Sequence, residues 1–318
     1  MQKWSHSLDV AVRTCERQVF YAARFANPTA AKGSPRHEAF LLSQARDFES
    51  WRGALVHSVI DQLIVPALAR GERFRVNKFQ GAVNALIDRQ AAFSASGKYR
   101  YVSKNAEKVD HCVLAQHLNG VGVSQAEIEQ VRTEVFAALH VLETNYAELL
   151  DRICRARERY SEREIRWRLD DQILVEAIPD LILIEKDSHA VIIDWKVWSG
   201  ERTNARDQLH AYAFVIVRCG YWPTLWSERV ELIEANLLTG ESITYSITED
   251  ELDLVDERIF LGSEKLKPIF ARLATECSPD DFAPATSPQA CLICPVKEIC
   301  SERVSAKPKT EQMLIKLF

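Results

Sequence analysis

The sequence predicts an α/β fold with a central mixed β-sheet flanked by helices and a large helical part at the N-terminal end. Up to about residue 160, apolar residues recur mostly at helical spacing. Residues 165–198, IRWRLDDQILVEAIPDLILIEKDSHAVIIDWKVW, are instead rich in Ile, Val, Leu and Trp between short polar turns, which is typical of strands. The 318 residues, 47% hydrophobic and 27% charged, have the composition of an ordinary globular protein.

The N-terminal half is predicted to be helical. Helices are expected over residues 1–25, 38–70 and most of 77–160. The glycine-containing stretch NGVGVSQAE interrupts the third region, and Ser124 followed by Glu127 predicts a capping box where the next helix begins.

The second half is predicted to form a βββαββ core. Three consecutive strands in 165–198 are followed by a helix over 203–218 with a threonine or asparagine cap, strands over 230–238 and 242–248, and a helix from about 249 to 274. The expected organisation is a helical part (1–160), a core (161–275) and a cysteine-bearing C-terminal tail (276–318), all within one compact unit.

Compartment and charge give weaker indications. No apolar run is long enough to span a membrane and the N-terminus lacks the apolar region of a secretory signal, so we expect a cytoplasmic protein. The net charge of −5 argues mildly against nucleic-acid binding. The arginine-dense stretch 152–168 is either a solvated helix with alternating charges or a groove wall that contacts phosphates.

Two aspartates and a lysine interrupt the apolar strands. Because side chains alternate along a strand, Asp194 and Lys196 point to one face and Trp195 to the other. A hairpin turn brings Asp180 beside them. Two adjacent carboxylates repel unless a cation lies between them, and hard oxygen ligands suit Mg²⁺ or Mn²⁺. The alternative is that both aspartates only cap strands.

The string P-D-x13-D-x-K, formed by Pro179-Asp180 and Asp194-Trp195-Lys196, resembles the motif of the PD-(D/E)XK nuclease superfamily. The resemblance implies a nuclease core whose mixed sheet carries a metal-dependent phosphodiesterase site. Asp180, Asp194 and the Trp195 backbone carbonyl would then bind the metal, and Lys196 would position the attacking water.

Further residues resemble the RecB-type branch of that superfamily. Gln208 and Tyr212 fit its Q-x3-Y motif on one helix face, which by resemblance contacts the substrate. His57, in RGALVHSVID, fits the histidine on an early helix that adds a metal ligand. Glu162 and Glu164 lie where the branch often has another acid, and we prefer Glu164.

Three cysteines near the C-terminus, Cys291, Cys294 and Cys300, form a C-x2-C-x5-C pattern. Thiolates select zinc or iron–sulfur clusters, and a four-thiolate site needs one more ligand. Cys15 resembles the N-terminal cysteine that completes a [4Fe–4S] cluster in AddB-type modules and in the small CRISPR-adaptation nucleases. The resemblance implies a structural [4Fe–4S] cluster that is bound by cysteines from both ends of the chain. A zinc site is the alternative.

The function implied by the resemblance is hydrolysis of DNA, by an exonuclease acting on ends or single strands in recombination, repair or antiviral defence. The alternatives are a CRISPR-adaptation end-trimming nuclease, working with integrase-type proteins, and a non-catalytic DNA-binding scaffold of the same fold. The sequence contains no P-loop motif, so a helicase, where one is needed, is a separate protein.

Overall fold

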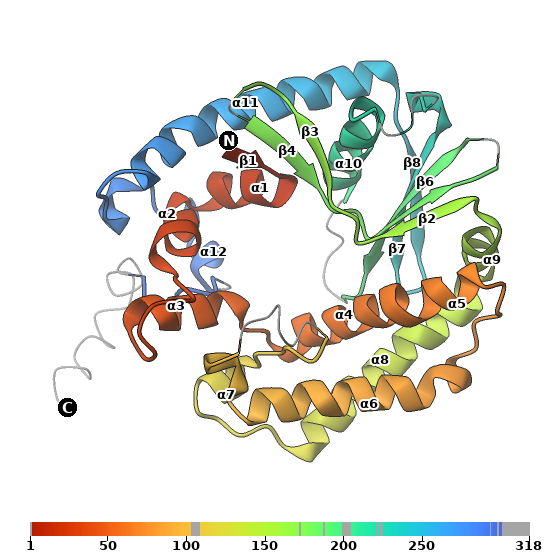
Figure 1. Cartoon of the computed structure of the whole chain (residues 1–318), viewed down its shortest axis with the longest axis horizontal. Helices are drawn as coiled ribbons and strands as arrows, with labels where there is room; N and C mark the ends of the chain where they lie inside the picture. Colours follow the sequence, from red (N-terminus) through yellow and green to blue (C-terminus); the bar gives the residue numbers. More distant parts are fainter. Residues whose placement is uncertain are drawn as a thin grey trace. The chain divides into compact units, whose positions relative to one another are not determined.

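The computed structural model describes residues 2–102, 109–171, 173–186, 188–198, 205–220, 222, 225–292, 294–297 and 299–300 (Figure 1). The chain divides into two compact units that are each discontinuous in sequence: unit 1 holds residues 1–6 and 46–261, and unit 2 holds residues 7–45 and 262–318. Neither unit coincides with one of the three expected parts, 1–160, 161–275 and 276–318. The helical N-terminal segment shares one core with the sheet, and the tail shares another core with residues near the start of the chain.

Two mixed sheets form in unit 1, where one was expected. A three-stranded sheet has the order β1-β4-β3, with β1 at Gln2–Trp4, β3 at Ile165–Arg168 and β4 at Ile173–Ala177. A five-stranded sheet has the order β2-β5-β6-β7-β8, with β2 at Glu158–Ser161, β5 at Leu181–Ile184, β6 at Ala190–Lys196, β7 at Val230–Asn236 and β8 at Ser242–Ser246. Only the pairs β1–β4 and β6–β7 are parallel in these sheets.

The region 165–198 thus contains four strands rather than three. One break falls after Arg168, where the carboxylate of Asp170 accepts a hydrogen bond from the backbone N–H of Ile173 and stabilises a turn. Another falls at Pro179, which lacks a backbone donor for a continuous strand. The helical region expected to continue to residue 160 ends at Arg155.

The helices of unit 1 follow the apolar periodicity of the sequence. They are α4 (Phe48–Val59), a π-helical turn (Ile60–Ile64), α5 (Val65–Ala69), α6 (Val76–Ala95), a 3₁₀ turn (Lys98–Arg100), α7 (Ala115–Leu118), α8 (Gln125–Asn145), α9 (Ala147–Arg155), α10 (Arg206–Arg218), a 3₁₀ turn (Ser227–Arg229) and the N-terminal part of α11 (Glu249–Leu273). The capping box of Ser124 and Glu127 is confirmed at the start of α8. The cap expected at residues 203 or 204 lies outside the described residues.

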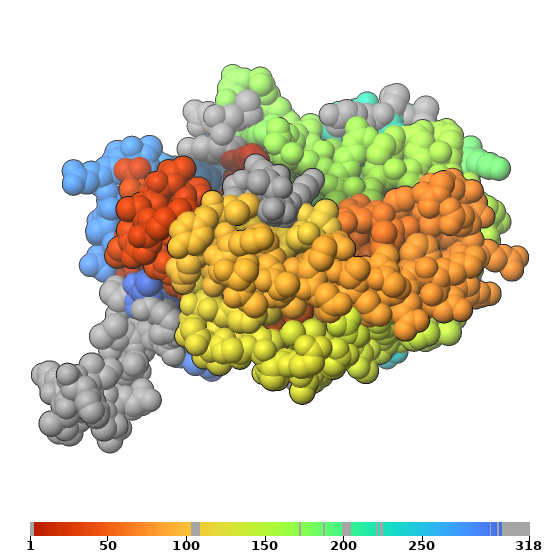
Figure 2. Space-filling view, turned by 60° about the horizontal axis from the view of Figure 1, so that its bottom comes forward, coloured from red at the N-terminus to blue at the C-terminus, as the bar shows by residue number. Residues whose placement is uncertain are grey.

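The five-stranded sheet is covered on both faces. The crossover helix α10 packs against β6 and β7 and also against β3 and β4 of the smaller sheet (Figure 1). The opposite face packs against α4, α5, α8 and α9 in one large apolar core, to which the strands contribute side chains such as Leu183, Ile193 and Trp195. In Figure 2 the orange and yellow helices form the near face of unit 1, next to green strand segments.

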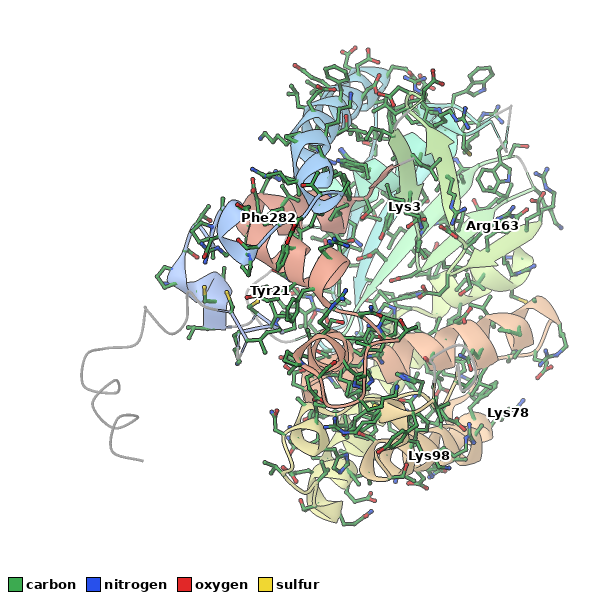
Figure 3. The ribbon with its side chains drawn as sticks, turned by 60° about the vertical axis from the view of Figure 1, so that its left-hand side comes forward. Lys3, Tyr21, Lys78, Lys98, Arg163 and Phe282 are labelled. Atoms are coloured by element: carbon green, nitrogen blue, oxygen red, sulfur yellow. The ribbon has the colours of Figure 1, made fainter. Side chains whose placement is uncertain are left out.

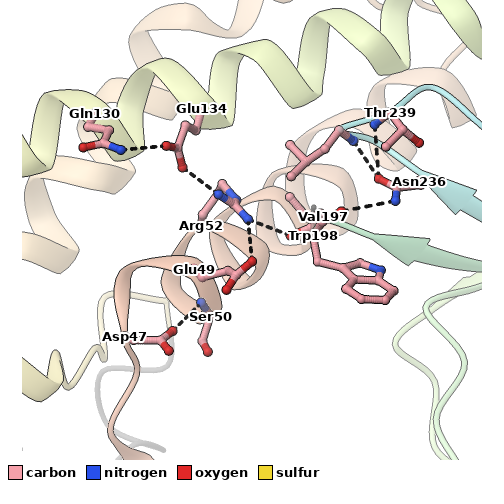
Figure 4. Close-up of polar contacts among 11 residues, drawn as sticks. Asp47, Glu49, Ser50, Arg52, Gln130, Glu134, Val197, Trp198, Asn236 and Thr239 are labelled. Carbon is pink, nitrogen blue, oxygen red and sulfur yellow. Dashed lines mark hydrogen bonds and ion pairs between the residues drawn. The ribbon is translucent and has the colours of Figure 1, made fainter. Parts of the chain in front are cut away.

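A buried arginine ties this helical layer to the end of β6. Arg52 of α4 is 8% exposed and donates to the carboxylate of Glu134 on α8 at 2.6 Å (Figure 4). The same guanidinium donates to the backbone carbonyl of Val197 at 3.1 Å. A charge-assisted network of this kind fixes the position of the strand end because a buried guanidinium must keep its partners. Asn236, at the end of β7, donates to the Trp198 carbonyl and extends the network.

Unit 2 is built from the two ends of the chain. Its elements are α1 (His6–Thr14), α2 (Glu16–Phe20), a π-helical turn (Tyr21–Phe25), α3 (Pro35–Gln44), the C-terminal part of α11 (Glu249–Leu273), a 3₁₀ turn (Pro279–Asp281) and α12 (Pro288–Leu292). The expected helix over 1–25 is interrupted because Cys15 adopts an extended conformation.

Unit 2 contains an apolar cluster of its own. Tyr21 and Phe282, both labelled in Figure 3, are buried there with Phe20, whose ring centroid lies 5.2 Å from that of Phe282. Cys294 and Cys300 pack against the same core.

Among the described residues there is no helix both long and apolar enough to cross a bilayer.

Candidate nuclease site and cysteine pocket

The site begins with a row of carboxylates across neighbouring strands. Asp194 on β6 is paired in register with Glu234 on β7. Leu181 pairs with Ile193, so Asp180 lies one step further along, opposite Asp194. Glu162 follows β2 in the same way, and its backbone N–H donates to the Asp180 carbonyl at 3.1 Å. Strand register therefore gathers acids from four separate sequence segments at one level of the sheet.

His57 completes a compact group with two of these acids. Its Nδ1 lies 3.5 Å from Asp180 Oδ1 and 3.8 Å from Glu162 Oε1. Ligand atoms of His57, Glu162 and Asp180 all lie within 4.8 Å of one another. Burial lowers the pKa of His57, but hydrogen bonds to the carboxylates of Asp180 and Glu162 outweigh it and raise that pKa to about 10. The imidazolium thus offsets the charge of the two acids.

The backbone of Glu162 makes this arrangement possible. Its φ of 48° lies in the left-handed region, which few non-glycine residues adopt. The left-handed residue ends β2 and turns the chain, and its carboxylate is held beside His57. A strained residue whose side chain joins a cluster of charges is a common feature of functional sites.

Asp194 and Lys196 lie on the same face of β6, as the alternation of side chains predicts, and Trp195 is buried in the helical core on the other face. Lys196 Nζ lies 2.5 Å from Asp194 Oδ2. Burial, followed by the charge of Asp180, raises the pKa of Asp194 to about 6, against the opposing effect of Lys196. A buried carboxylate in this state gains most from a nearby cation.

The predicted Q-x3-Y residues of α10 face the same group. Lys196 Nζ donates to Gln208 Oε1 at 3.3 Å, and Gln208 Nε2 donates to the Tyr212 hydroxyl at 2.7 Å. Burial raises the pKa of the Tyr212 hydroxyl, and the charges of Asp194 and Asp180 add to that effect, so the ring lies within electrostatic range of the acids. The structure thereby brings Gln208 and Tyr212 into one polar chain with Lys196.

The preference for Glu164 as the additional acid is not supported by its position. Glu164 accepts a hydrogen bond from Arg166 at 2.7 Å and lies 3.6 Å from Lys3, beside the smaller sheet (Figure 3 labels Lys3). Glu162 occupies the expected place instead. The two acids are two residues apart, and their sequence contained no sign of the left-handed turn that separates them.

Glu234 is an acid of the site region that sequence reasoning missed. It is 5% exposed, accepts a hydrogen bond from the Tyr245 hydroxyl at 3.0 Å and accepts another from the backbone N–H of Ala205, which precedes α10. It therefore holds the start of α10 against β7. The available signal was an acid inside the apolar run VELIEANLL, the same pattern that drew attention to Asp194.

The donor set fits a hard divalent cation. Carboxylate oxygens and one imidazole nitrogen converge, and they suit Mg²⁺ or Mn²⁺ better than a soft metal. Asp180 Oδ2 accepts a hydrogen bond from the Trp195 backbone N–H at 2.7 Å, which orients the carboxylate. The Trp195 carbonyl as a ligand stays a prediction.

The two neighbouring acids give a matched test. If the site hydrolyses DNA as the resemblance implies, Glu162→Gln is expected to lower the rate of DNA cleavage at least about tenfold. The reason is that loss of a charged group beside a metal weakens the affinity for that metal. Glu164→Gln is expected to change cleavage by less than about twofold, since its carboxylate lies beside Lys3 and Arg166. The measurement is the single-turnover rate over a series of Mn²⁺ concentrations. An equal loss in both variants would contradict the assignment of Glu162.

A second candidate site lies within unit 2. Cys15, Cys291, Cys294 and Cys300 line one pocket, together with Arg17 and Lys297. Burial raises the pKa of Cys15 and of Cys294, whereas backbone N–H groups that contact the two sulfurs lower it. The thiols of Cys291 and Cys300 interact electrostatically with both. The structure thus brings the four predicted cysteines together from both ends of the sequence.

Comparison with known proteins identifies the family. The family model of the PD-(D/E)XK nuclease superfamily matches residues 3–301. No curated protein matches the chain. One solved structure, described as "Crystal structure of SSO0001", is 12% identical over 71% of this chain and 94% of its own, with a TM-score of 0.26. The family match spans both the helical part and the sheets. The α/β chain, with its mixed sheets flanked by helices, therefore belongs to the PD-(D/E)XK nuclease superfamily, whose members are usually metal-dependent nucleases.

Proposed function

We propose that the chain is a Mg²⁺- or Mn²⁺-dependent deoxyribonuclease, an exonuclease that acts on DNA ends or single strands. The single observation that carries the proposal is that Asp180 and Asp194 lie opposite each other on adjacent strands, with Lys196 paired to Asp194 and with His57 and Glu162 beside Asp180. The presence of the whole set, metal-binding acids and lysine together, argues against a scaffold without activity.

Each residue has a role that follows from its contacts. Asp180, Asp194, Glu162 and His57 would hold the metal, and His57 would release its proton to do so. When bound, the metal supplies charge stabilisation at the phosphate and acidifies a water. Lys196, held between Asp194 and Gln208, would orient that water and offset developing negative charge. Gln208 and Tyr212 would place the substrate strand.

We also propose that the cysteine pocket holds a structural [4Fe–4S] cluster. In the described part of the chain, no three of the four cysteine sulfurs lie within 4.8 Å of one another. Four sulfurs that bind one tetrahedral zinc with Zn–S bonds of about 2.3 Å must lie about 3.8 Å from one another. A cluster in which each thiolate binds a different iron accommodates wider spacing. Arg17 and Lys297 would offset the charge of the ligated group.

The partners of this activity are also proposals. Because the sequence contains no P-loop motif, unwinding of a duplex would come from a separate helicase-type protein. An integrase-type partner would fit the alternative role in trimming the ends of captured DNA.

The proposal is tested with end-labelled linear single strands and closed single-stranded circles of the same sequence. The wild-type chain, purified without oxygen, is expected to degrade the linear strand in Mn²⁺, to leave the circle intact and to lose all cleavage in EDTA. Cleavage of the circle would contradict exonuclease action. DNA binding without cleavage under any of these conditions would favour the scaffold.

A further inference from the structure

An aromatic cluster lies beside the carboxylate row and contributes none of the proposed metal ligands. The Trp222 ring packs edge-on against Tyr160 of β2, with centroids 5.4 Å apart and an interplanar angle of 62°. The guanidinium carbon of Arg163 lies 4.4 Å from the centroid of the same tyrosine ring (Figure 3 labels Arg163). We call Tyr160, Arg163 and Trp222 the aromatic platform.

The platform lies on the sheet face that carries the catalytic residues. Tyr160 pairs with Ile182, which pairs with Ile192, two residues before Asp194 on the same strand. Side chains two residues apart share a face. The intervening Arg159 donates to the carbonyls of Ile153 and Cys154 at the end of α9, on the opposite face. A nucleic-acid strand that is bound at the carboxylates and runs along β2 would therefore contact Tyr160 next to the carboxylates.

The platform is held in place before any ligand binds. Glu158 accepts hydrogen bonds from the Tyr160 hydroxyl and from the Trp222 side chain, and these contacts lower its pKa. The left-handed turn at Glu162 lets Arg163 return over the ring of Tyr160. One backbone turn thus places Glu162 beside His57 and a guanidinium beside the aromatic rings.

The platform is partly open to solvent. Tyr160, Arg163 and Trp222 are each only half-buried. Half-exposed aromatic rings beside a cation are the features with which proteins bind unpaired nucleotides, since a base stacks on the ring and a phosphate accepts from the guanidinium. The bases of a duplex are already stacked and offer no free face.

We infer that the aromatic platform binds an unpaired nucleotide of the substrate strand next to the scissile phosphate, so that the enzyme selects single-stranded DNA at its site. This inference rests on the proposed nuclease function and adds the residues that would recognise the strand. Arg163 would contact a phosphate and Trp222 or Tyr160 would stack on a base.

The test measures binding in an Asp194→Asn background, which prevents cleavage. The probe is a short fluorescein-labelled oligothymidylate, compared with a blunt duplex of the same length, and anisotropy in Mg²⁺ gives Kd. Trp222→Leu and Arg163→Met are each expected to weaken single-strand binding about tenfold, with less than about twofold change for the duplex. Trp222→Phe is expected to restore most of the affinity because it keeps a ring.

The control is Trp226→Leu, which removes a tryptophan of the same loop that is 58% exposed and lies near the start of β7, away from the carboxylates. The inference would be wrong if Trp222→Leu and Arg163→Met left the Kd for the single strand unchanged. It would also be wrong if they weakened binding of the single strand and of the duplex equally. Cleavage of the same oligonucleotide by the wild-type chain in Mn²⁺ is measured in parallel. Absence of cleavage by the wild-type chain would contradict the proposed nuclease function. Normal cleavage by the wild type, together with unchanged single-strand binding by the variants, would contradict only the role of the aromatic platform.

Discussion

Asp194→Asn is expected to abolish cleavage, with a fall of at least about 10³-fold, equivalent to about 4 kcal/mol of transition-state stabilisation. Asparagine keeps the shape of the side chain but removes the charge that lies 2.5 Å from Lys196 and opposite Asp180. The proposed metal would lose a charged ligand, and Lys196 would lose the partner that orients it. The measurement is the single-turnover rate with saturating Mn²⁺.

The same substitution is not expected to unfold the protein. The pKa of Asp194 in the folded chain is about 6, above the ordinary value of 3.8, so folding disfavours its ionised form. The metal-free protein therefore loses stability as the pH rises from about 4 through about 6, and a neutral asparagine avoids this loss at pH 7.5. The thermal midpoint of the metal-free variant should equal or exceed that of the wild type.

A matched control is Glu176→Gln on β4, which removes an acid that pairs with Lys3 at 2.7 Å on the smaller sheet. This variant should keep wild-type cleavage, since Glu176 is not part of the carboxylate row. Asp194→Asn retaining more than about a tenth of the wild-type rate would show that the residue does not bind an essential metal.

The central part of the site was predictable because it depends on local rules. Alternation along one strand places Asp194 and Lys196 together, and a hairpin is enough to bring Asp180 opposite them. The i, i+4 spacing places Gln208 and Tyr212 on one helix face. These relations involve at most two neighbouring elements, so a single sequence contains the information.

The choice of Glu162 over Glu164 and the position of Glu234 depend on backbone geometry that the sequence does not indicate. Glu162 was distinguished from Glu164 only by a left-handed turn, and Glu234 joins the row only because β7 lies parallel to β6 after a helical crossover. The second sheet was also not predicted. Its strand β1, at Gln2–Trp4, pairs with β4 across more than half of the chain, and no local pattern predicts such a partner.

Cys291→Ser is expected to remove the iron and the brown colour from the anaerobically purified protein and to destabilise unit 2. One cluster of buried apolar side chains in this unit consists of Val19, Phe20, Tyr21, Ile269, Leu273, Phe282 and Val296, and Cys294 and Cys300 pack against it. Loss of a bound cluster beside these side chains would remove the binding free energy that it adds to folding. A cluster bound by Cys15 and three late cysteines would join two segments separated by most of the chain, which constrains the unfolded state.

The wild type should contain about four irons per chain and resist limited proteolysis near both ends. Cys291→Ser should lose the iron and be cleaved by the protease within residues 7–45 and 262–300. Cys219→Ser is the matched control, because this half-buried cysteine lies in unit 1 just after α10, where its thiol donates to the Ile216 carbonyl. It should keep iron, colour and protease resistance. A colourless wild type with about one zinc per chain would establish the zinc site instead. Full iron content in Cys291→Ser would exclude that cysteine as a ligand.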